Sequence, residues 1–424
     1  MDYEIADSLT EEEIEEEVLT YNGATLESDG DYYAVDLIGG NNATLAGGDG
    51  NDTIYNYGCK VLIKGDAGNN EINNFGYNAT IYGGADSDTL INGISELNIQ
   101  GDDVSVTGYK SKIFVGAGDD SIYNEADCAE LNGEDGADSF TNYGWNVSIN
   151  GGLGADSVEN YGNETHISLG EDDDEIINYS EYVLAYGDDG NDSFFNFGEN
   201  STLDGGEGVD EIENYGDVSS LAGGSSNDYI YSSGKNSTLN GGADNDFLYN
   251  EGVYGYLIGS KGNDTLYNEG DHVTMSGGAG NDLIINDGKH IEYKFGKSDG
   301  KDTVYGFNAG DTIQITSGTY SAKKSGDDVI VTVGKAKLTL IDAVNKEINF
   351  VSKSGVTTTK TYSAKSKSKS SAQVLIEEDN VETSELSSLI QPVAKEYSPY
   401  RFDTSLKLAK EEPFTPELTF ASEK

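Results

Sequence analysis

Aspartates recur at a fixed interval along most of this chain of 424 residues. From Asp120 an aspartate stands at every eighteenth position as far as Asp282, and Asp52, Asn70 and Asp88 keep the same step upstream. The residue two positions after each of them is apolar throughout. A row of carboxylates in a chain with a formal net charge of −52 attracts cations and repels nucleic acid and anionic membrane surfaces. We therefore expect a cationic partner.

The repeat also predicts the architecture that positions these carboxylates. A second series of apolar residues follows the first by nine positions and includes Ile63, Ile81, Ile99 and Leu131. Each eighteen-residue turn should therefore contain two short strands that face each other across a thin core, joined by glycine-rich turns. The predicted fold is all-β: a right-handed parallel β-roll (β-solenoid) of about fourteen 18-residue turns, with a small β C-terminal flank.

The first of the two turns in each repeat has a distinctive sequence. It is Gly-Gly-Asp-Gly-Asn-Asp-Thr-Ile at residues 47–54 and Gly-Gly-Ala-Gly-Asn-Asp-Leu-Ile at residues 277–284. This is the G-G-x-G-x-D-x-U-x nonapeptide, and over residues 38–310 the chain resembles the RTX (hemolysin-type calcium-binding repeat) family. Ca²⁺ takes six to eight oxygen ligands, and glycines at positive φ let successive carbonyls turn toward one point.

The resemblance implies where calcium would bind. In the family each ion lies between loops eighteen residues apart and is shared by their aspartates and carbonyls. Carried over by position, the ligands here are Asp52, Asp88, Asp120, Asp138, Asp156, Asp174, Asp192, Asp210, Asp228, Asp246, Asp264 and Asp282, and Asp302 is expected to end the row.

The second turn of each repeat predicts no metal. It has sequences such as Asn56-Tyr57-Gly58, and the position equivalent to the aspartate holds residues without a carboxylate, such as Val61 and Leu97. Stacked asparagines can hydrogen-bond from turn to turn as an amide ladder. This departs from the RTX roll, which binds calcium along both sides, so we expect one calcium row.

Two irregularities should affect that row. Asn70 replaces an aspartate, so the site there is expected to be weak or absent. Between Asp88 and Asp120 the spacing is 32 residues, and a short turn near Thr107 would place Val106 where a ligand is needed. We expect the roll to continue through this segment with a defect and the calcium row to be interrupted.

The regions outside the repeat differ in composition. Residues 1–37 are an acidic leader or cap, with a short helix near residues 8–18, and residues 38–292 form the roll. The segment 293–351 shows hairpin-like alternation and is expected to be a β cap. Residues 352–372 form a Ser/Lys linker. The RTX resemblance marks residues 373–424, with one short helix from Thr383, as a tail recognised by type I secretion machinery.

These features favour a secreted, extracellular bacterial protein, released or held at the cell surface, whose roll folds on binding Ca²⁺. The start has no conventional signal peptide, and no segment is long and apolar enough to span a membrane. The alternative is a metal-free structural solenoid in which the aspartates only form Asx turns, acting as an adhesin or carbohydrate-binding surface. We expect no enzymatic activity, because no catalytic motif or preceding domain is present.

Three further groups of residues have side chains that could serve a function. Tyrosines at one outward position could bind carbohydrate, although stacking on one another explains them more simply: Tyr55, Tyr123, Tyr231, Tyr249 and Tyr267. His272 and His290 lie one turn apart and could share a metal, but no carboxylate or thiol accompanies them, which favours solvated loop residues. Cys59 and Cys128 are about four turns apart and should be free.

Overall fold

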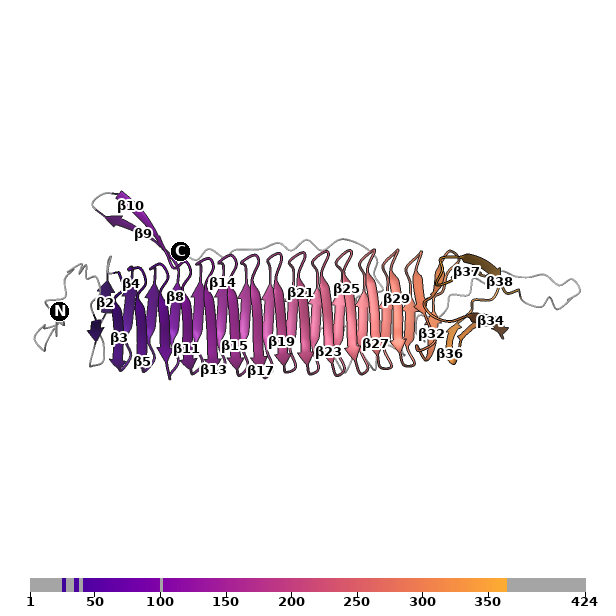
Figure 1. Ribbon diagram of the computed structural model, residues 1–424, viewed down its shortest axis with the longest axis horizontal. Coiled ribbons are helices and arrows are strands. Elements are labelled where there is room, and N and C mark those ends of the chain that lie inside the picture. Colours follow the sequence, from indigo (N-terminus) through magenta and orange to yellow (C-terminus); the bar gives the residue numbers. More distant parts are fainter. Residues whose placement is uncertain (1–24, 28–33, 38–40, 100–101, 364–424) are drawn as a thin grey trace, which may run out of the picture. The chain divides into compact units, whose positions relative to one another are not determined.

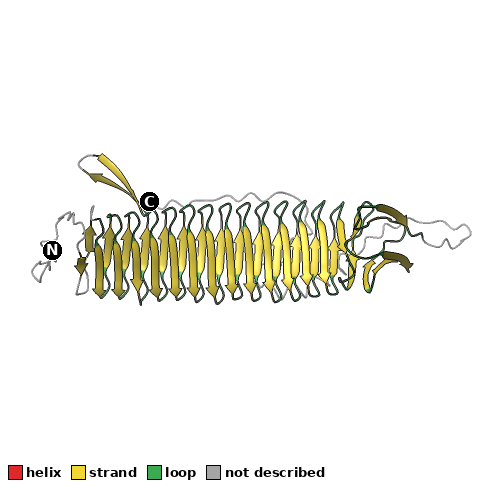
Figure 2. Cartoon of the chain, viewed as in Figure 1, coloured by secondary structure: helices red, strands yellow, loops and turns green. Residues whose placement is uncertain are grey.

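The computed structural model describes residues 25–27, 34–37, 41–99 and 102–363, and within them every regular element is a β-strand. The strands stack as a parallel β-solenoid of about 14 turns spaced about 18 residues apart, which confirms the predicted all-β architecture (Figures 1 and 2). No helix in the described ranges is long and apolar enough to cross a membrane.

Two sheets of 18 strands each make up the stack. The first sheet contains β1 (Thr25–Glu27), β3 (Thr44–Asp49), β5 (Leu62–Ala67), β7 (Thr80–Gly84), β11 (Lys112–Ala117), β13 (Glu130–Asp135), β15 (Ser148–Leu153), β17 (His166–Glu171), β19 (Leu184–Asp189), β21 (Thr202–Glu207), β23 (Ser220–Ser225), β25 (Thr238–Ala243), β27 (Tyr256–Lys261), β29 (Thr274–Ala279), β31 (Glu292–Phe295), β33 (Thr312–Ile315), β37 (Glu347–Val351) and β38 (Thr357–Thr361).

The second sheet contains β2 (Ala34–Leu37), β4 (Thr53–Asn56), β6 (Glu71–Asn74), β8 (Thr89–Asn92), β12 (Ser121–Asn124), β14 (Ser139–Asn142), β16 (Ser157–Asn160), β18 (Glu175–Asn178), β20 (Ser193–Asn196), β22 (Glu211–Asn214), β24 (Tyr229–Ser232), β26 (Phe247–Asn250), β28 (Thr265–Asn268), β30 (Leu283–Asn286), β32 (Lys301–Tyr305), β36 (Ala336–Leu340), β35 (Asp328–Val333) and β34 (Tyr320–Ser325).

The register between neighbouring turns places equivalent residues side by side. Ile149 of β15 pairs with Ile167 of β17, and Phe140 of β14 pairs with Val158 of β16. These four side chains are at most 2% exposed and belong to one continuous core between the sheets. Because each turn buries its apolar residues only against its neighbours, the stack is the stable unit.

The chain between Asp88 and Asp120 differs from its prediction. Strands β9 (Ile94–Ile99) and β10 (Asp102–Thr107) pair only with each other, as an antiparallel hairpin. Meanwhile β7 pairs directly with β11, and β8 with β12. The expected short turn is therefore wrong: the hairpin branches off between two adjacent turns, and Ile113, instead of Ile99, continues the apolar series. Likewise Ser111, instead of Leu97, stands at the non-ligand position of the second turn.

The two ends of the described stack differ. Strands β1 and β2 pair in parallel with β3 and β4, so the described stack starts within the segment expected to be the leader. At the other end β36, β35 and β34 form an antiparallel meander, and β38 pairs antiparallel to β37. The expected helices near residues 8–18 and from Thr383, and the tail 373–424, lie outside the described residues.

Candidate metal centre along the first turns

The predicted ligands form one unbroken ladder on the first turns of the repeats. We call them, together with Asn70, the aspartate row. The backbone N–H of each member donates to the side-chain Oδ1 of the next, as from Asp138 to Asp156 at 2.7 Å and from Asp264 to Asp282 at 3.0 Å. All are at most 3% exposed. The last donation, from Asp282 to Asp302 at 3.2 Å, ends the row where the sequence predicted.

The row also passes the hairpin without a break. The N–H of Asp88 donates to Oδ1 of Asp120, 32 residues away. The ladder of aspartates therefore continues past the predicted defect, since the fourteen additional residues lie in β9, β10 and their connection. Val106 belongs to the hairpin and takes no ligand position.

The second carboxylate oxygen is what makes the row chemically unusual. Along almost the whole row, Oδ2 is buried and has no hydrogen-bond partner in the described structure. This holds for Asp88, Asp120, Asp138, Asp156, Asp174, Asp192, Asp210, Asp228, Asp246, Asp264 and Asp282. A buried, unpaired carboxylate oxygen is costly, so it requires a proton or a cation.

Asn70 shows what the neighbourhood of that oxygen requires. Its Oδ1 accepts from the N–H of Asp52 at 3.0 Å, as an aspartate would, while its Nδ2 donates to the carbonyl oxygen of Gly68 at 2.8 Å. By the repeat, Oδ2 of an aspartate takes the place of that nitrogen. The carboxylate oxygen and the carbonyl oxygen then face each other with no hydrogen-bond donor between them. A bound cation or proton would satisfy both oxygens.

A glycine makes room for this arrangement in most turns, and Val115 and Leu169 replace it in two of them. The position that a Cβ would take on Gly205 lies too close both to Oδ2 of Asp210 and to the carbonyl oxygen of Gly223 in the next turn. Carboxylate and carbonyl oxygens from adjacent turns therefore converge on one point, which is open only because residue 205 lacks a side chain. Oxygen-only donor sets of this kind suit Ca²⁺.

The electrostatics of the row follow from burial and like charge. Desolvation is the main cause that raises the pKa of Asp138 to about 6. Desolvation together with repulsion from Asp210 and Asp246 raises the pKa of Asp228 to about 8. The N–H bond from the preceding aspartate opposes these shifts. Near neutral pH the metal-free row is thus partly protonated.

The oxygen atoms along the aspartate row suit calcium, but they are spread along the row instead of gathering in one cluster of side chains. Within the described ranges no three His, Cys, Asp or Glu side chains gather as a metal-binding group. Each ion would be held by the Oδ2 atoms of adjacent row members together with loop carbonyls, such as those beside Gly205. A bound divalent ion would neutralise the buried charge between turns.

The asparagines of the second turns form the predicted amide ladder. Nδ2 of each donates to Oδ1 of the next, as from Asn142 to Asn160 at 2.8 Å and from Asn160 to Asn178 at 2.9 Å. Each Nδ2 also bonds a carbonyl in its own turn, for example that of Gly162 at 3.0 Å. These side chains are 0% exposed, and the ladder needs no metal.

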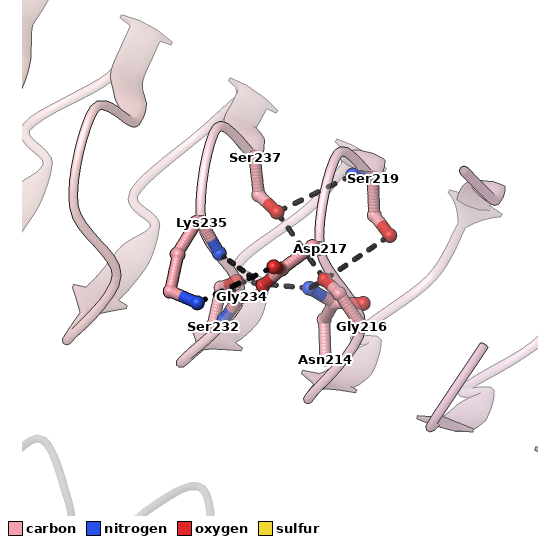
Figure 3. A network of polar contacts seen from close by, with 8 residues as sticks. All are labelled: Asn214, Gly216, Asp217, Ser219, Ser232, Gly234, Lys235 and Ser237. Carbon is pink, nitrogen blue, oxygen red and sulfur yellow. Dashed lines mark hydrogen bonds and ion pairs between the residues drawn. The ribbon is translucent and has the colours of Figure 1, made fainter. Parts of the chain in front are cut away.

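The ladder is interrupted once, at Ser232. Nδ2 of Asn214 donates to the Ser232 hydroxyl at 2.9 Å, and the N–H of Gly234 donates to it at 3.2 Å (Figure 3). Serine is too short to continue the ladder, and Oδ1 of Asn250 in the next turn is buried without a partner. Ser237 lines the same turn and donates to the carbonyl of Gly216 at 3.4 Å.

Aromatic side chains stack along the outside of the second turns. The rings of Tyr143, Tyr161, Tyr179, Phe197 and Tyr215 follow one another with centroids 4.6–5.3 Å apart and planes within 8°. Parallel stacking covers the ring faces, which are the surfaces that would contact a sugar. The five side chains are 37–47% exposed.

Other aromatic side chains on the outside of the roll also contact their counterparts in neighbouring turns. Tyr231, Tyr249 and Tyr267 contact one another, with neighbouring centroids 4.9–5.3 Å apart. His272 stacks on His290 with a centroid distance of 4.9 Å. Cys59 and Cys128 are free, as expected.

Sequence reasoning missed the five-ring stack and a third ladder. On the outside of the first turns the amides of Asn227, Asn245, Asn263 and Asn281 each bond the next, for example from Asn263 to Asn245 at 3.1 Å. The signals were present: an aromatic residue follows the asparagine in several second turns, and an asparagine often precedes the aspartate.

Comparison with known proteins adds little to this geometry. No family model matches the chain, and no curated protein matches it. The extracellular lipase LipA from Serratia marcescens is a solved structure with 20% sequence identity and a TM-score of 0.22. The similarity covers 45% of this chain and 38% of the lipase chain, so the chain spans well under two thirds of the lipase's length. A likeness at this level carries no argument about function.

Proposed function

We propose that this protein is a secreted calcium-binding repeat protein of the RTX type, whose β-solenoid folds when Ca²⁺ binds along the aspartate row. The observation that carries the proposal is the series of buried Oδ2 atoms in the aspartate row, which have no hydrogen-bond partners and occur at nearly every turn. Their neighbours are carbonyl oxygens, and the equivalent place in the second turns from Val61 to Ile291 is never a carboxylate, Asp311 being the first.

The proposed mechanism is a charge switch. Without calcium, repulsion within a chain of net charge −52 opposes closure of the thin core. Bound calcium neutralises the row, so its binding energy becomes folding energy. In a cytosol poor in free calcium the chain would stay unfolded and competent for type I secretion, and millimolar calcium outside a bacterial cell would fold it. We expect it to act as a scaffold or surface protein without catalysis.

The test compares the full chain in calcium and in EDTA. Circular dichroism should show strand signal in calcium and its loss in chelator, and equilibrium dialysis with radiolabelled calcium should find several ions per chain. Strand signal that persists unchanged in EDTA at neutral pH, with no calcium bound, would reject the proposal.

A metal-free structural solenoid is the second candidate, and one observation favours it. The Oδ1 ladder is complete without an ion, and Asn70 satisfies both of its side-chain atoms within the protein. Protonated aspartates could do the same. Its role as a carbohydrate-binding surface gains no support from the aromatic stack, whose ring faces are covered. The dialysis experiment separates the two candidates.

A further inference from the structure

Asparagines occupy the tip of five of the second turns at an identical backbone position. They are Asn42, Asn78, Asn146, Asn200 and Asn236, here called the tip asparagines, and their φ angles lie between 54° and 60°. Four are exposed and Asn200 is half-buried. Among their side chains in the described structure, only that of Asn146 makes a hydrogen bond, a long one of 3.5 Å to Sγ of Cys128. These amides are thus accessible and nearly unengaged.

A hydroxyl residue follows every tip asparagine by two positions. These are Thr44, Thr80, Ser148, Thr202 and Thr238, and each is the first residue of a strand of the first sheet and is exposed or half-buried. Each pair therefore forms an N-x-S/T sequence, the acceptor sequence for N-linked sugars.

The fold alone does not require this pairing. Nine other second turns hold a different residue at the tip, namely Lys60, Lys110, Cys128, Glu164, Tyr182, Val218, Tyr254, His272 and His290. Of these nine, only two are followed two positions later by a hydroxyl residue, Ser220 or Thr274. Leu62, Lys112 and Glu130 show that the strand position accepts apolar, basic and acidic side chains. The hydroxyl accompanies the asparagine, and the backbone does not demand it.

We infer that the tip asparagines are acceptor sites for N-linked glycosylation. A sugar activated as a glycosyl phosphate is the co-substrate, supplied to a separate transferase. Nδ2 of the asparagine bonds to the anomeric carbon, the bond from that carbon to the phosphate oxygen breaks, a base of the transferase takes the amide proton, and the phosphate leaves. The sugars would stand along the second turns, on the side of the roll away from the aspartate row.

Five further N-x-S/T sequences in the chain serve as internal controls, because their asparagines are held by the roll. They begin at Asn51, Asn163, Asn178, Asn191 and Asn263. Asn178 is 0% exposed and belongs to the asparagine ladder. In the other four, Oδ1 accepts a backbone N–H from the next turn. All five should stay unmodified.

The experiment is peptide mass spectrometry of the full chain secreted by its own organism, digested with proteases that cut at acidic and aromatic residues. We expect sugar on the tip asparagines and none on the five control asparagines. The variant Thr202→Ala should lose the sugar on Asn200 only, whereas Thr274→Ala, at the same strand position after His272, should lose none.

Unmodified tip asparagines in the secreted protein, or sugar retained on Asn200 in the Thr202→Ala variant, would overturn the inference. Circular dichroism of both variants checks that the roll is intact. Calcium content measured on the same samples keeps this result separate from that of the proposed calcium function.

Discussion

Asp88 and Asp120 are 32 residues apart in the chain and yet are adjacent members of one ladder, joined by the bond from the N–H of Asp88 to Oδ1 of Asp120. The segment between them contributes eighteen residues to the roll and fourteen, Ile94–Thr107, to a hairpin. At the hairpin's base the N–H of Gly108 donates to the carbonyl of Gly93 at 2.8 Å. The insertion is thus closed off from the stack.

Deleting residues 94–107 should leave the roll intact. Joining Gly93 to Gly108 recreates an eighteen-residue repeat in which Asn92 and Ser111 keep their positions in the second turn. Because β7 and β8 already pair with β11 and β12, no pairing of the stack is lost. Circular dichroism and calcium stoichiometry should match those of the full chain. A lower calcium count in the deletion variant would show that the hairpin supports the row.

The eighteen-residue spacing predicted which residues form the site, but it could not predict how their carboxylates are hydrogen-bonded. An eighteen-residue period places Asp156 beside Asp174 and Asn142 beside Asn160 in any parallel solenoid, so both rows followed from the sequence. It could not say that Oδ1 would be occupied by a backbone bond and Oδ2 left alone, because that depends on the side-chain rotamer.

The hairpin was mispredicted for a physical reason. Leu97 and Ile99 are apolar, as the inward positions of the roll require. The sequence is therefore compatible both with a defective turn of the roll and with a hairpin outside it. Only the pairing of β7 with β11 decides between them. The third ladder was missed because its positions are exposed and tolerate Ala137 and Val209, which mask the asparagine pattern.

Asparagine substitutions in the aspartate row should separate calcium binding from metal-free stability. Asp210→Asn retains the Oδ1 acceptor and supplies an N–H₂ donor, as Asn70 does toward Gly68. We expect this variant to bind fewer calcium ions and to resist unfolding better in EDTA. Conversely, Asn70→Asp should bind additional calcium and be less stable in EDTA. Equilibrium dialysis and thermal melts in both media provide the measurements.

Equal calcium counts in Asp210→Asn and the parent chain would contradict this assignment. The matched control is Asn286→Asp at the end of the asparagine row. It adds a carboxylate to a second turn. The number of bound calcium ions should not increase, because the glycine opening that lies beside the aspartate row is absent there.

In EDTA, stability should fall as the pH rises. The row aspartates have folded pKa values raised by desolvation, to about 6 for Asp138 and about 8 for Asp228, while an unfolded aspartate has a pKa near 4. Between these values the folded state binds more protons than the unfolded state. The stabilisation is therefore complete below about pH 4 and is lost progressively as the pH rises toward 8.

Thermal melts in EDTA between pH 4 and pH 8 test that dependence. Calcium must displace the protons, so its addition near pH 7 should also acidify a weakly buffered sample. A melting temperature in EDTA that rises with pH over this range would mean that the carboxylates are not buried as described.

Restoring the asparagine ladder should stabilise the roll. In Ser232→Asn, Nδ2 of the new residue can donate to Oδ1 of Asn250, which is buried without a partner, and its Oδ1 can accept from Asn214. One recovered buried hydrogen bond contributes about 1 kcal/mol, so the melting temperature in calcium should rise.

The reverse change, Asn160→Ser, creates the same gap in an intact part of the ladder and should lower the melting temperature by a similar amount. If Ser232→Asn is neutral while Asn160→Ser is destabilising, the gap beside Asn250 is already bridged, and a crystal structure of the parent chain should then show an ordered water between Ser232 and Asn250.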